Sequence, residues 1–133
     1  MIKFEYKSKK IKELCEKHNI KLLILHGSYA KNLTHKDSDI DVGILSNKKI
    51  DNKEYFSILR DFGELFGDKF DPAFLNTAEP MINFHVAING KLLYEDQKGS
   101  FANFKIESIA KYNDTKKFRN LEKLYIKKAI GAV

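Results

Sequence analysis

The stretch HGSYAKNLTHKDSDIDVGIL, residues 26–45, joins a Gly-Ser pair to two aspartates that are separated by one residue. The pair ends the apolar run IKLLILHG (20–27), which is short and nearly continuous, as is typical of a buried central strand. Ten residues separate Ser28 from Asp39, which opens a second strand-like run, DIDVGILS (39–46). The stretch therefore predicts two strands, with a Gly-Ser turn after the first and paired carboxylates at the start of the second.

The two aspartates of the second strand are expected to point the same way. Side chains at i and i+2 of a strand share a face, so Asp39 and Asp41 lie together while Ile40, Val42 and Ile44 face a core. Adjacent carboxylates repel and raise each other's pKa, and a hard cation removes that conflict. Mg²⁺ typically takes one or two carboxylates together with phosphate oxygens. The pair therefore predicts a magnesium site beside a phosphate-bearing ligand.

The Gly-Ser pair supplies features that suit the phosphates. Glycine at the end of a strand lets the backbone approach a ligand, and a short helix over 28–33 would point free N–H groups at an anion. The hydroxyl of Ser28 adds one more donor. Neither G-x-x-x-x-G-K-[ST] nor G-x-G-x-x-G occurs in the chain. We expect Gly27 and Ser28 to hold a triphosphate by a different motif.

A third carboxylate stands on a later predicted strand, KFDPAFLN (69–76). Transfer of a nucleotidyl group needs a metal-bridging set and a group that accepts the proton of the attacking hydroxyl. Asp71 is the candidate for either task, and Pro72 favours an edge position for this strand. Taken singly, a Gly-Ser turn or an Asp-x-Asp pair more often belongs to an ordinary surface. The Gly-Ser turn, the Asp-x-Asp pair and Asp71 together indicate a site for nucleotidyl transfer.

The rest of the chain predicts an α/β or α+β domain with a small mixed sheet flanked by helices. Residues 1–133 are expected to form a single domain, with a core at about 8–96 and a helical tail at about 101–130, read as one long helix or two consecutive ones. The other expected elements are helices at 8–18, 52–67 and 79–90 and a strand at 91–95.

Composition narrows the class of protein. The hydrophobic fraction of 43% is that of a globular chain, and the single cysteine, Cys15, excludes an internal disulfide and a cysteine zinc cluster. No apolar run is long enough to span a bilayer, and the first residues lack the apolar core of a signal peptide, so a cytoplasmic protein is expected. The net charge of +6 comes from scattered lysines interleaved with acids, which favours a solvated surface over a nucleic-acid site.

The motif resembles that of the DNA polymerase β-like nucleotidyltransferase superfamily, a Gly-Ser followed about ten residues later by Asp-x-Asp. Within it, GSYAKNLTHKDSDIDVGIL is similar to the minimal nucleotidyltransferases, whose usual form is G-S-x-A-x-G…S-D-x-D. The matching positions are Gly27, Ser28, Ala30, Ser38, Asp39 and Asp41. FDPAFLNTAEPMINFHVAINGKLLYE is similar to the later family segment, so the resemblance covers roughly residues 10–96. The sequence departs from the pattern at Lys31, where arginine is usual, and at Asn32, where glycine is usual.

The resemblance implies transfer of a nucleoside monophosphate from an NTP to a hydroxyl, with release of pyrophosphate. Such proteins typically pair with a HEPN-domain toxin and add AMP to its tyrosine, so a hetero-oligomer with that partner is implied. On this basis Asp39, Asp41 and Asp71 bind Mg²⁺, two ions being expected, and Asp71 also serves as base. Gly27 and Ser28, with Lys31, hold the ATP.

Three functions remain open on the sequence alone. The first is an adenylyltransferase antitoxin, and the second is a transferase for a small molecule such as an aminoglycoside, which usually needs a larger acceptor-binding domain. The third is an antitoxin that acts by contact alone, against which the intact carboxylates argue. Nucleic acid is not expected as a direct substrate, because 133 residues leave no room for a template-binding domain. His26 is expected to pack or to support the site rather than to react.

Overall fold

The computed structural model describes residues 7–27 and 39–131 of the chain. These residues form four strands and five helices, and their order follows the sequence expectation apart from the helix at 28–33, which lies outside the described residues. The elements are α1 (Ser8–Lys17), β1 (Ile20–His26), β2 (Ile40–Ser46), α2 (Asn52–Phe66), β3 (Phe70–Phe74), α3 (Pro80–Asn89), β4 (Lys91–Glu95), α4 (Ser100–Asp114) and α5 (Lys116–Ala129).

The strands form one mixed sheet in the order β3-β2-β1-β4, which confirms the predicted sheet. Strand β1 pairs antiparallel with β2 and with β4, whereas β2 and β3 are parallel. Strand β3 lies at an edge of the sheet, as Pro72 indicated, because proline has no N–H to give to a second neighbour. The parallel pairing sets Asp41 opposite Asp71.

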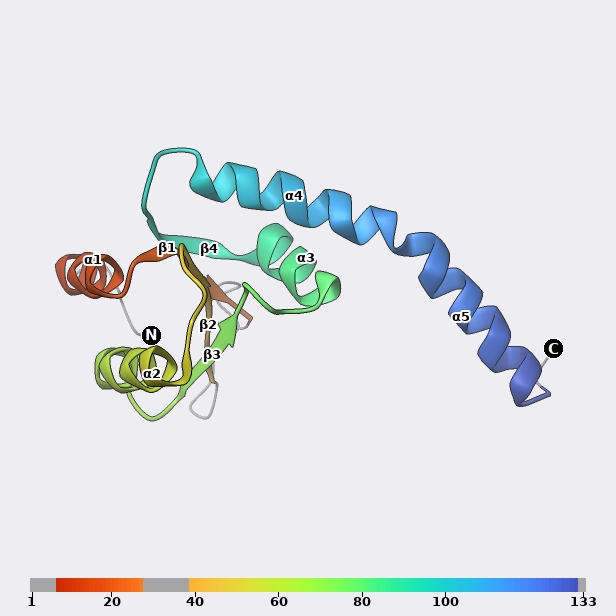
Figure 1. Cartoon of the computed structure of the whole chain (residues 1–133), viewed down its shortest axis with the longest axis horizontal. Helices are drawn as coiled ribbons and strands as arrows, with labels where there is room; N and C mark the ends of the chain where they lie inside the picture. Colours follow the sequence, from red (N-terminus) through yellow and green to blue (C-terminus); the bar gives the residue numbers. More distant parts are fainter. Residues whose placement is uncertain (1–6, 28–38, 132–133) are drawn as a thin grey trace.

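Helices cover both faces of the sheet, and this explains the continuous apolar run of β1. Leu23 and Leu25 pack into a core with α1 and α2, while Leu22 and Ile24 pack into a second core with α3 and α4. The two pairs of helices lie on opposite sides of the strands (Figure 1). A strand buried on both faces needs apolar residues on both sides, so Leu22 to Leu25 form a continuous apolar run without alternation.

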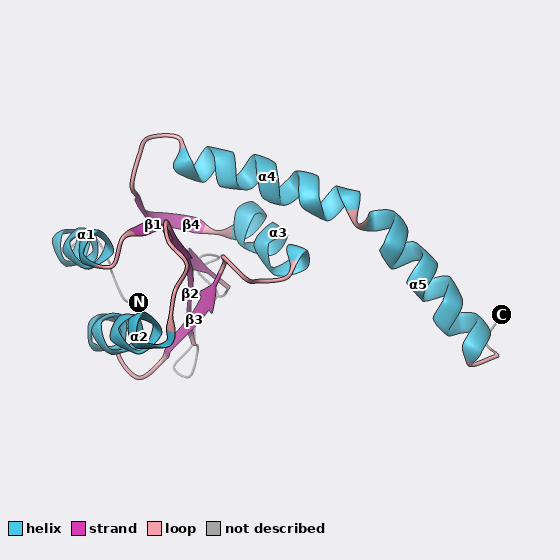
Figure 2. Ribbon diagram, in the orientation of Figure 1, coloured by secondary structure: helices cyan, strands magenta, loops and turns pink. Residues whose placement is uncertain are grey.

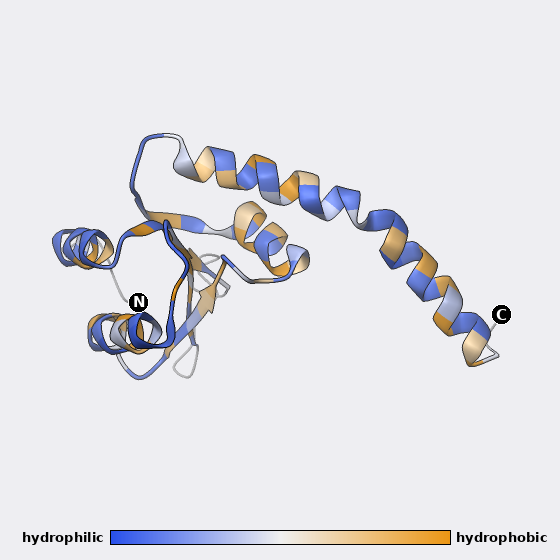
Figure 3. Cartoon of the chain, in the orientation of Figure 1, coloured by the Kyte–Doolittle hydropathy of each residue, from blue (hydrophilic) through white to orange (hydrophobic). Residues whose placement is uncertain are grey.

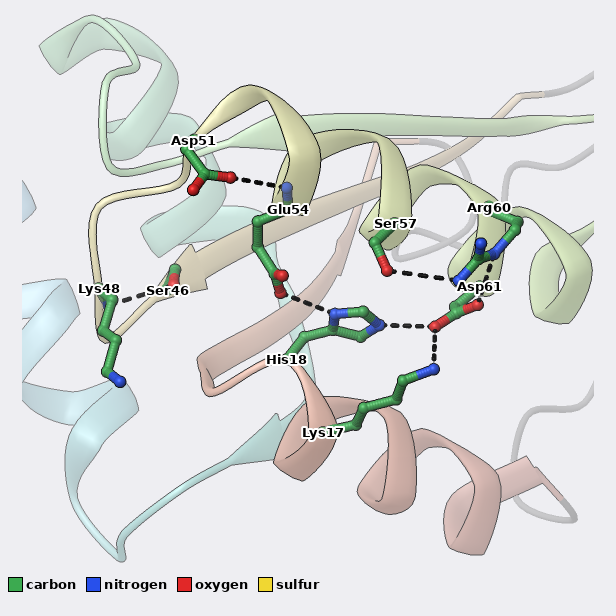
Figure 4. Close-up of polar contacts among 9 residues, drawn as sticks. All are labelled: Lys17, His18, Ser46, Lys48, Asp51, Glu54, Ser57, Arg60 and Asp61. Atoms are coloured by element: carbon green, nitrogen blue, oxygen red, sulfur yellow. Dashed lines mark hydrogen bonds and ion pairs between the residues drawn. The ribbon is translucent and has the colours of Figure 1, made fainter.

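A cluster of polar side chains joins the end of α1 to α2 (Figure 4). His18 is buried, and its Nδ1 lies 2.8 Å from Oε1 of Glu54 while its Nε2 lies 2.7 Å from Oδ2 of Asp61. Lys17 Nζ donates to the same Asp61 oxygen at 2.9 Å, and Arg60 Nε donates to the other at 3.2 Å. The hydrogen bonds from Lys17 and His18 hold the pKa of Asp61 well below its usual range.

Replacement of Asp61 by Asn is expected to lower the free energy of unfolding by about 2 kcal/mol at pH 7, because hydrogen bonds to a charged acceptor are lost. Since the folded-state pKa of Asp61 is depressed, its contribution is complete above the unfolded pKa and is lost as the pH falls. The difference between the variant and the unsubstituted protein should therefore shrink below about pH 4. Urea titrations at pH 7 and pH 3 measure this difference in the free energy of unfolding. Glu64→Gln, which changes an exposed residue on the same helix, is the control. A difference that is the same at both pH values would contradict this role.

The tail consists of two helices rather than one. Helix α4 lies along α3 and buries Phe104 and Ser108, and the chain bends at Thr115 before α5 begins. Helix α5 extends away from the sheet and its covering helices (Figures 1 and 2). No helix in the described part of the chain is long and apolar enough to cross a membrane.

Candidate functional site

Strand pairing brings His26, Asp41 and Asp71 side by side on three neighbouring strands. His26 of β1 stands opposite Asp41 of β2, which in turn stands opposite Asp71 of β3. Asp39 precedes Asp41 by two residues, just before β2 begins. The site therefore lies at the end of the sheet where β1 finishes and β2 and β3 start.

The carboxylates belong to the sheet face that α3 and α4 cover. Asp41 shares its face with Gly43, where an added Cβ would meet Leu75 and Val86 of the second core. The intervening Ile40, Val42 and Ile44 are buried in the other core, as the alternation of the strand predicted. Beyond the end of the second core, the face carries acidic side chains in place of apolar ones.

Asp41 is strained electrostatically by its neighbours. Burial, the hydrogen bond to Asp71 and the negative charges of Asp71 and Asp39 raise the pKa of Asp41 to about 6. Without a cation, a proton between Asp41 and Asp71 relieves the repulsion. Hard carboxylate oxygens in mutual conflict are a donor set that suits Mg²⁺, which would take the place of that proton.

Asp41 and Asp71 form the contact pair of the site, and Asp39 is exposed beside them. Within residues 7–27 and 39–131, no three His, Cys, Asp or Glu side chains are already arranged around one metal position. The predicted metal ligands thus lie together at one end of the sheet without a preformed cage.

Gly27 has a second role that the sequence did not reveal. Its φ of +69° lies in the left-handed region, which glycine enters without strain. A Cβ at this position would collide with Oδ2 of Asp41, far inside van der Waals contact. The absence of a side chain therefore makes room for a carboxylate, and the contact of Gly27 with a phosphate stays a prediction. Ser28 and Lys31, predicted to bind the phosphates, and the expected helix at 28–33 lie outside the described residues, so their roles stay predictions.

His26 is a half-buried polar residue that lies next to the carboxylates. Its Nε2 is buried and has no hydrogen-bond partner among the described residues. Burial lowers the pKa of His26, and the charge of Asp71 offsets this in part. The expectation that His26 packs or supports the site agrees with this position beside Asp41. Because alternate side chains of a strand share a face, His26 lies on the same face of β1 as Leu22 and Ile24.

Comparison with known proteins also indicates a nucleotidyltransferase. The family described as "Polymerase beta, Nucleotidyltransferase" matches residues 9–99. The protein adenylyltransferase MntA of Shewanella oneidensis is 26% identical over 93 residues, which are 70% of this chain and 66% of that protein. The match thus spans just under two thirds of the length of MntA.

Solved structures share the fold over nearly the whole chain. A toxin–antitoxin structure with AMP-PNP is 22% identical, with a TM-score of 0.76 over 90% of this chain and 97% of that one. A complex of tri-AMPylated Shewanella oneidensis HEPN toxin with its MNT antitoxin is 20% identical, with a TM-score of 0.73 over 93% of this chain and 98% of that one. The predicted fold, a minimal polymerase β-like core with a helical tail, is confirmed. With its site at the paired ends of β1, β2 and β3, the chain belongs to the polymerase beta nucleotidyltransferase family.

Proposed function

We propose that this chain transfers AMP from ATP to a hydroxyl group, that of a tyrosine, on a HEPN-domain toxin, and so acts as its antitoxin in the cytoplasm. The observation that carries the proposal is the carboxylate pair Asp41–Asp71, with Asp39 beside it and Gly27 against it. The similarity to MntA, to a toxin–antitoxin structure with the ATP analogue AMP-PNP, and to an antitoxin in complex with a tri-AMPylated toxin supports the choice of AMP and of a protein acceptor.

In this proposal the three aspartates hold Mg²⁺, two ions being the expected number, and the metal neutralises the triphosphate charge when it is bound. Asp71 is exposed on an edge strand, where an acceptor hydroxyl has access to it. Its carboxylate accepts the proton of that hydroxyl. The oxygen of the acceptor then bonds to the α-phosphorus, and the bond from that phosphorus to pyrophosphate breaks.

The phosphate-binding half rests on Gly27, Ser28 and Lys31. Gly27 follows the last residue of β1 and lies beside Asp41, so its backbone lies at the edge of the carboxylate site. The hydroxyl of Ser28 and the ammonium of Lys31 would donate to phosphate oxygens. Lysine makes a point-charge contact in place of the forked contact of arginine, so removal of Lys31 should weaken ATP binding without abolishing transfer.

The experiment is a transfer assay with ATP labelled at the α-phosphate, Mg²⁺ and the protein encoded by the neighbouring gene. We expect label on that protein, and the double variant Asp39→Asn/Asp41→Asn should label it at least about a thousandfold more slowly. Label transfer that persists in the double variant would refute the metal assignment. Aminoglycoside-dependent release of pyrophosphate would show a small-molecule transferase instead. Full neutralisation of the toxin by the double variant would show that contact alone suffices.

A further inference from the structure

Helix α5 displays a row of apolar side chains that nothing in the described chain covers. Phe118, Leu121, Leu124 and Tyr125 are 74%, 62%, 59% and 78% exposed, and none of the helix residues, all of which the structure describes, is buried. Phe118, Leu121 and Tyr125 stand three and four residues apart, so they lie on one side of the helix. We call these four side chains the α5 stripe. Apolar and polar residues interleave along α5 in Figure 3.

A stack of side chains holds the start of α5. The ring of Tyr112 on α4 stacks on Phe84 of α3 with centroids 4.0 Å apart, and the guanidinium of Arg119 on α5 lies 3.9 Å from the centroid of Tyr112. Arg119 Nη1 also donates to the carbonyl of Tyr112 at 3.0 Å and to Oγ1 of Thr115. The stack connects α3, α4 and α5, so contacts with α3 and α4 hold the start of α5.

The charges of α5 indicate what kind of surface covers the stripe. The helix carries one acidic residue, Glu122, against six basic ones, which are Lys116, Lys117, Arg119, Lys123, Lys127 and Lys128. At 100° per residue, Lys117 and Lys128 stand in line with Leu121 and Leu124, one at each end, so the stripe has a basic border. A second copy of the chain would set this border against like charge, which is unfavourable. An apolar groove with an acidic rim is complementary to it.

We propose that the α5 stripe docks into such a groove on the protein that receives AMP. This inference rests on the proposed function and identifies the surface by which the acceptor protein is held. Apolar anchors at i, i+3 and i+7 are the usual way in which an amphipathic helix enters a groove. A helix of 14 residues is only marginally stable alone in water, so burial of the stripe also stabilises α5.

The test compares two variants of the full chain. Leu121→Gln/Tyr125→Gln removes two anchors with a residue that keeps helix propensity, and Phe56→Gln makes the same kind of change on α2, where Phe56 is 67% exposed. Calorimetry with the neighbour-encoded protein gives Kd, and the labelling assay gives KM for that protein and kcat. We expect both Kd and KM to rise about 30-fold or more in the stripe variant only. Affinity for a non-hydrolysable ATP analogue and the circular dichroism of the helices should stay unchanged.

The charged border has its own test. Lys117→Glu/Lys128→Glu should weaken the complex, and the Kd of the unsubstituted chain should rise with salt, because an acidic rim pairs with the basic border. A Kd that is insensitive to both changes would overturn the acidic groove.

The outcomes distinguish this inference from the proposed function. If the stripe variant binds and labels the partner as the unsubstituted chain does, the docking surface is wrong and the proposed function stands. If binding depends on the stripe but no label is transferred, the docking surface stands and the proposed function fails. A chain that does not bind the neighbour-encoded protein, a dimer that the stripe variant loses, or stripe-dependent binding to anionic phosphatidylserine vesicles or to RNA would each overturn the inference.

Discussion

Replacement of Asp41 by Asn is expected to abolish nucleotidyl transfer and, in the metal-free protein, to increase stability at pH 8. Transfer should fall by about a thousandfold or more, because a carboxylate aimed at the metal and phosphates is lost. Stability should rise because the neutral amide is not repelled by Asp71 and Asp39. The charges of these two neighbours help to raise the pKa of Asp41 to about 6. Functional carboxylates held in repulsion commonly show this exchange of stability for activity.

The pH dependence of stability follows from the raised pKa of Asp41. The folded chain keeps the Asp41 proton at pH values where the unfolded chain, with the ordinary pKa of 3.8, has lost it. The unsubstituted protein therefore loses stability as the pH rises from about 4 to about 6, and the Asn variant does not. Thermal melts in EDTA at pH 4 and pH 8 measure the difference, which should appear only at pH 8.

The matched control is Asp68→Asn, a change of an exposed aspartate between α2 and β3. This substitution should change neither the rate of nucleotidyl transfer nor the melting temperatures at pH 4 and pH 8. An Asp41→Asn chain that melts below the unsubstituted protein at pH 8 would show that the Asp41 carboxylate contributes stability, contrary to the inferred repulsion.

Replacement of Gly27 by Ala is expected to reduce transfer by about a hundredfold and to destabilise the fold. The φ of +69° costs an L-residue about 1 kcal/mol, and the new Cβ would collide with Oδ2 of Asp41. The carboxylate must move, and misplacement of a reacting group by about an ångström costs about a hundredfold in rate. The labelling assay measures the rate, and urea unfolding measures the stability.

Gly99→Ala separates these two effects. Gly99 also has a positive φ, +97°, but an added Cβ there meets nothing within 4 Å. Gly99→Ala should lower the free energy of unfolding through the strained backbone but should not lower the rate of nucleotidyl transfer. Equal effects of the two substitutions on transfer would mean that the collision with Asp41 has no catalytic consequence.

Much of the fold was predictable because its signals are local. Apolar runs bounded by glycine and polar turns indicated the strands, and apolar spacing of three and four indicated α1, α2 and the helical tail. Pro80 and the pair Asn89-Gly90 indicated α3. Pro72 indicated the edge strand for a reason confined to one residue, its missing N–H. Alternation along the second strand predicted that Asp41 faces away from Ile40, Val42 and Ile44, and these three are buried in the first core, whereas Asp39 lies just before β2 begins.

The elements, and the residues proposed for the carboxylate site, thus followed from the sequence alone, because the patterns that indicate them involve neighbours a few positions away. The tertiary structure decided that Asp71 stands opposite Asp41, that burial and the neighbouring carboxylates raise the pKa of Asp41 to about 6, and that Gly27 makes room for a carboxylate. It also divided the tail at Thr115 and left α5 without cover. Strand register, burial and packing arise from contacts between segments far apart in the chain, and local periodicity does not contain them.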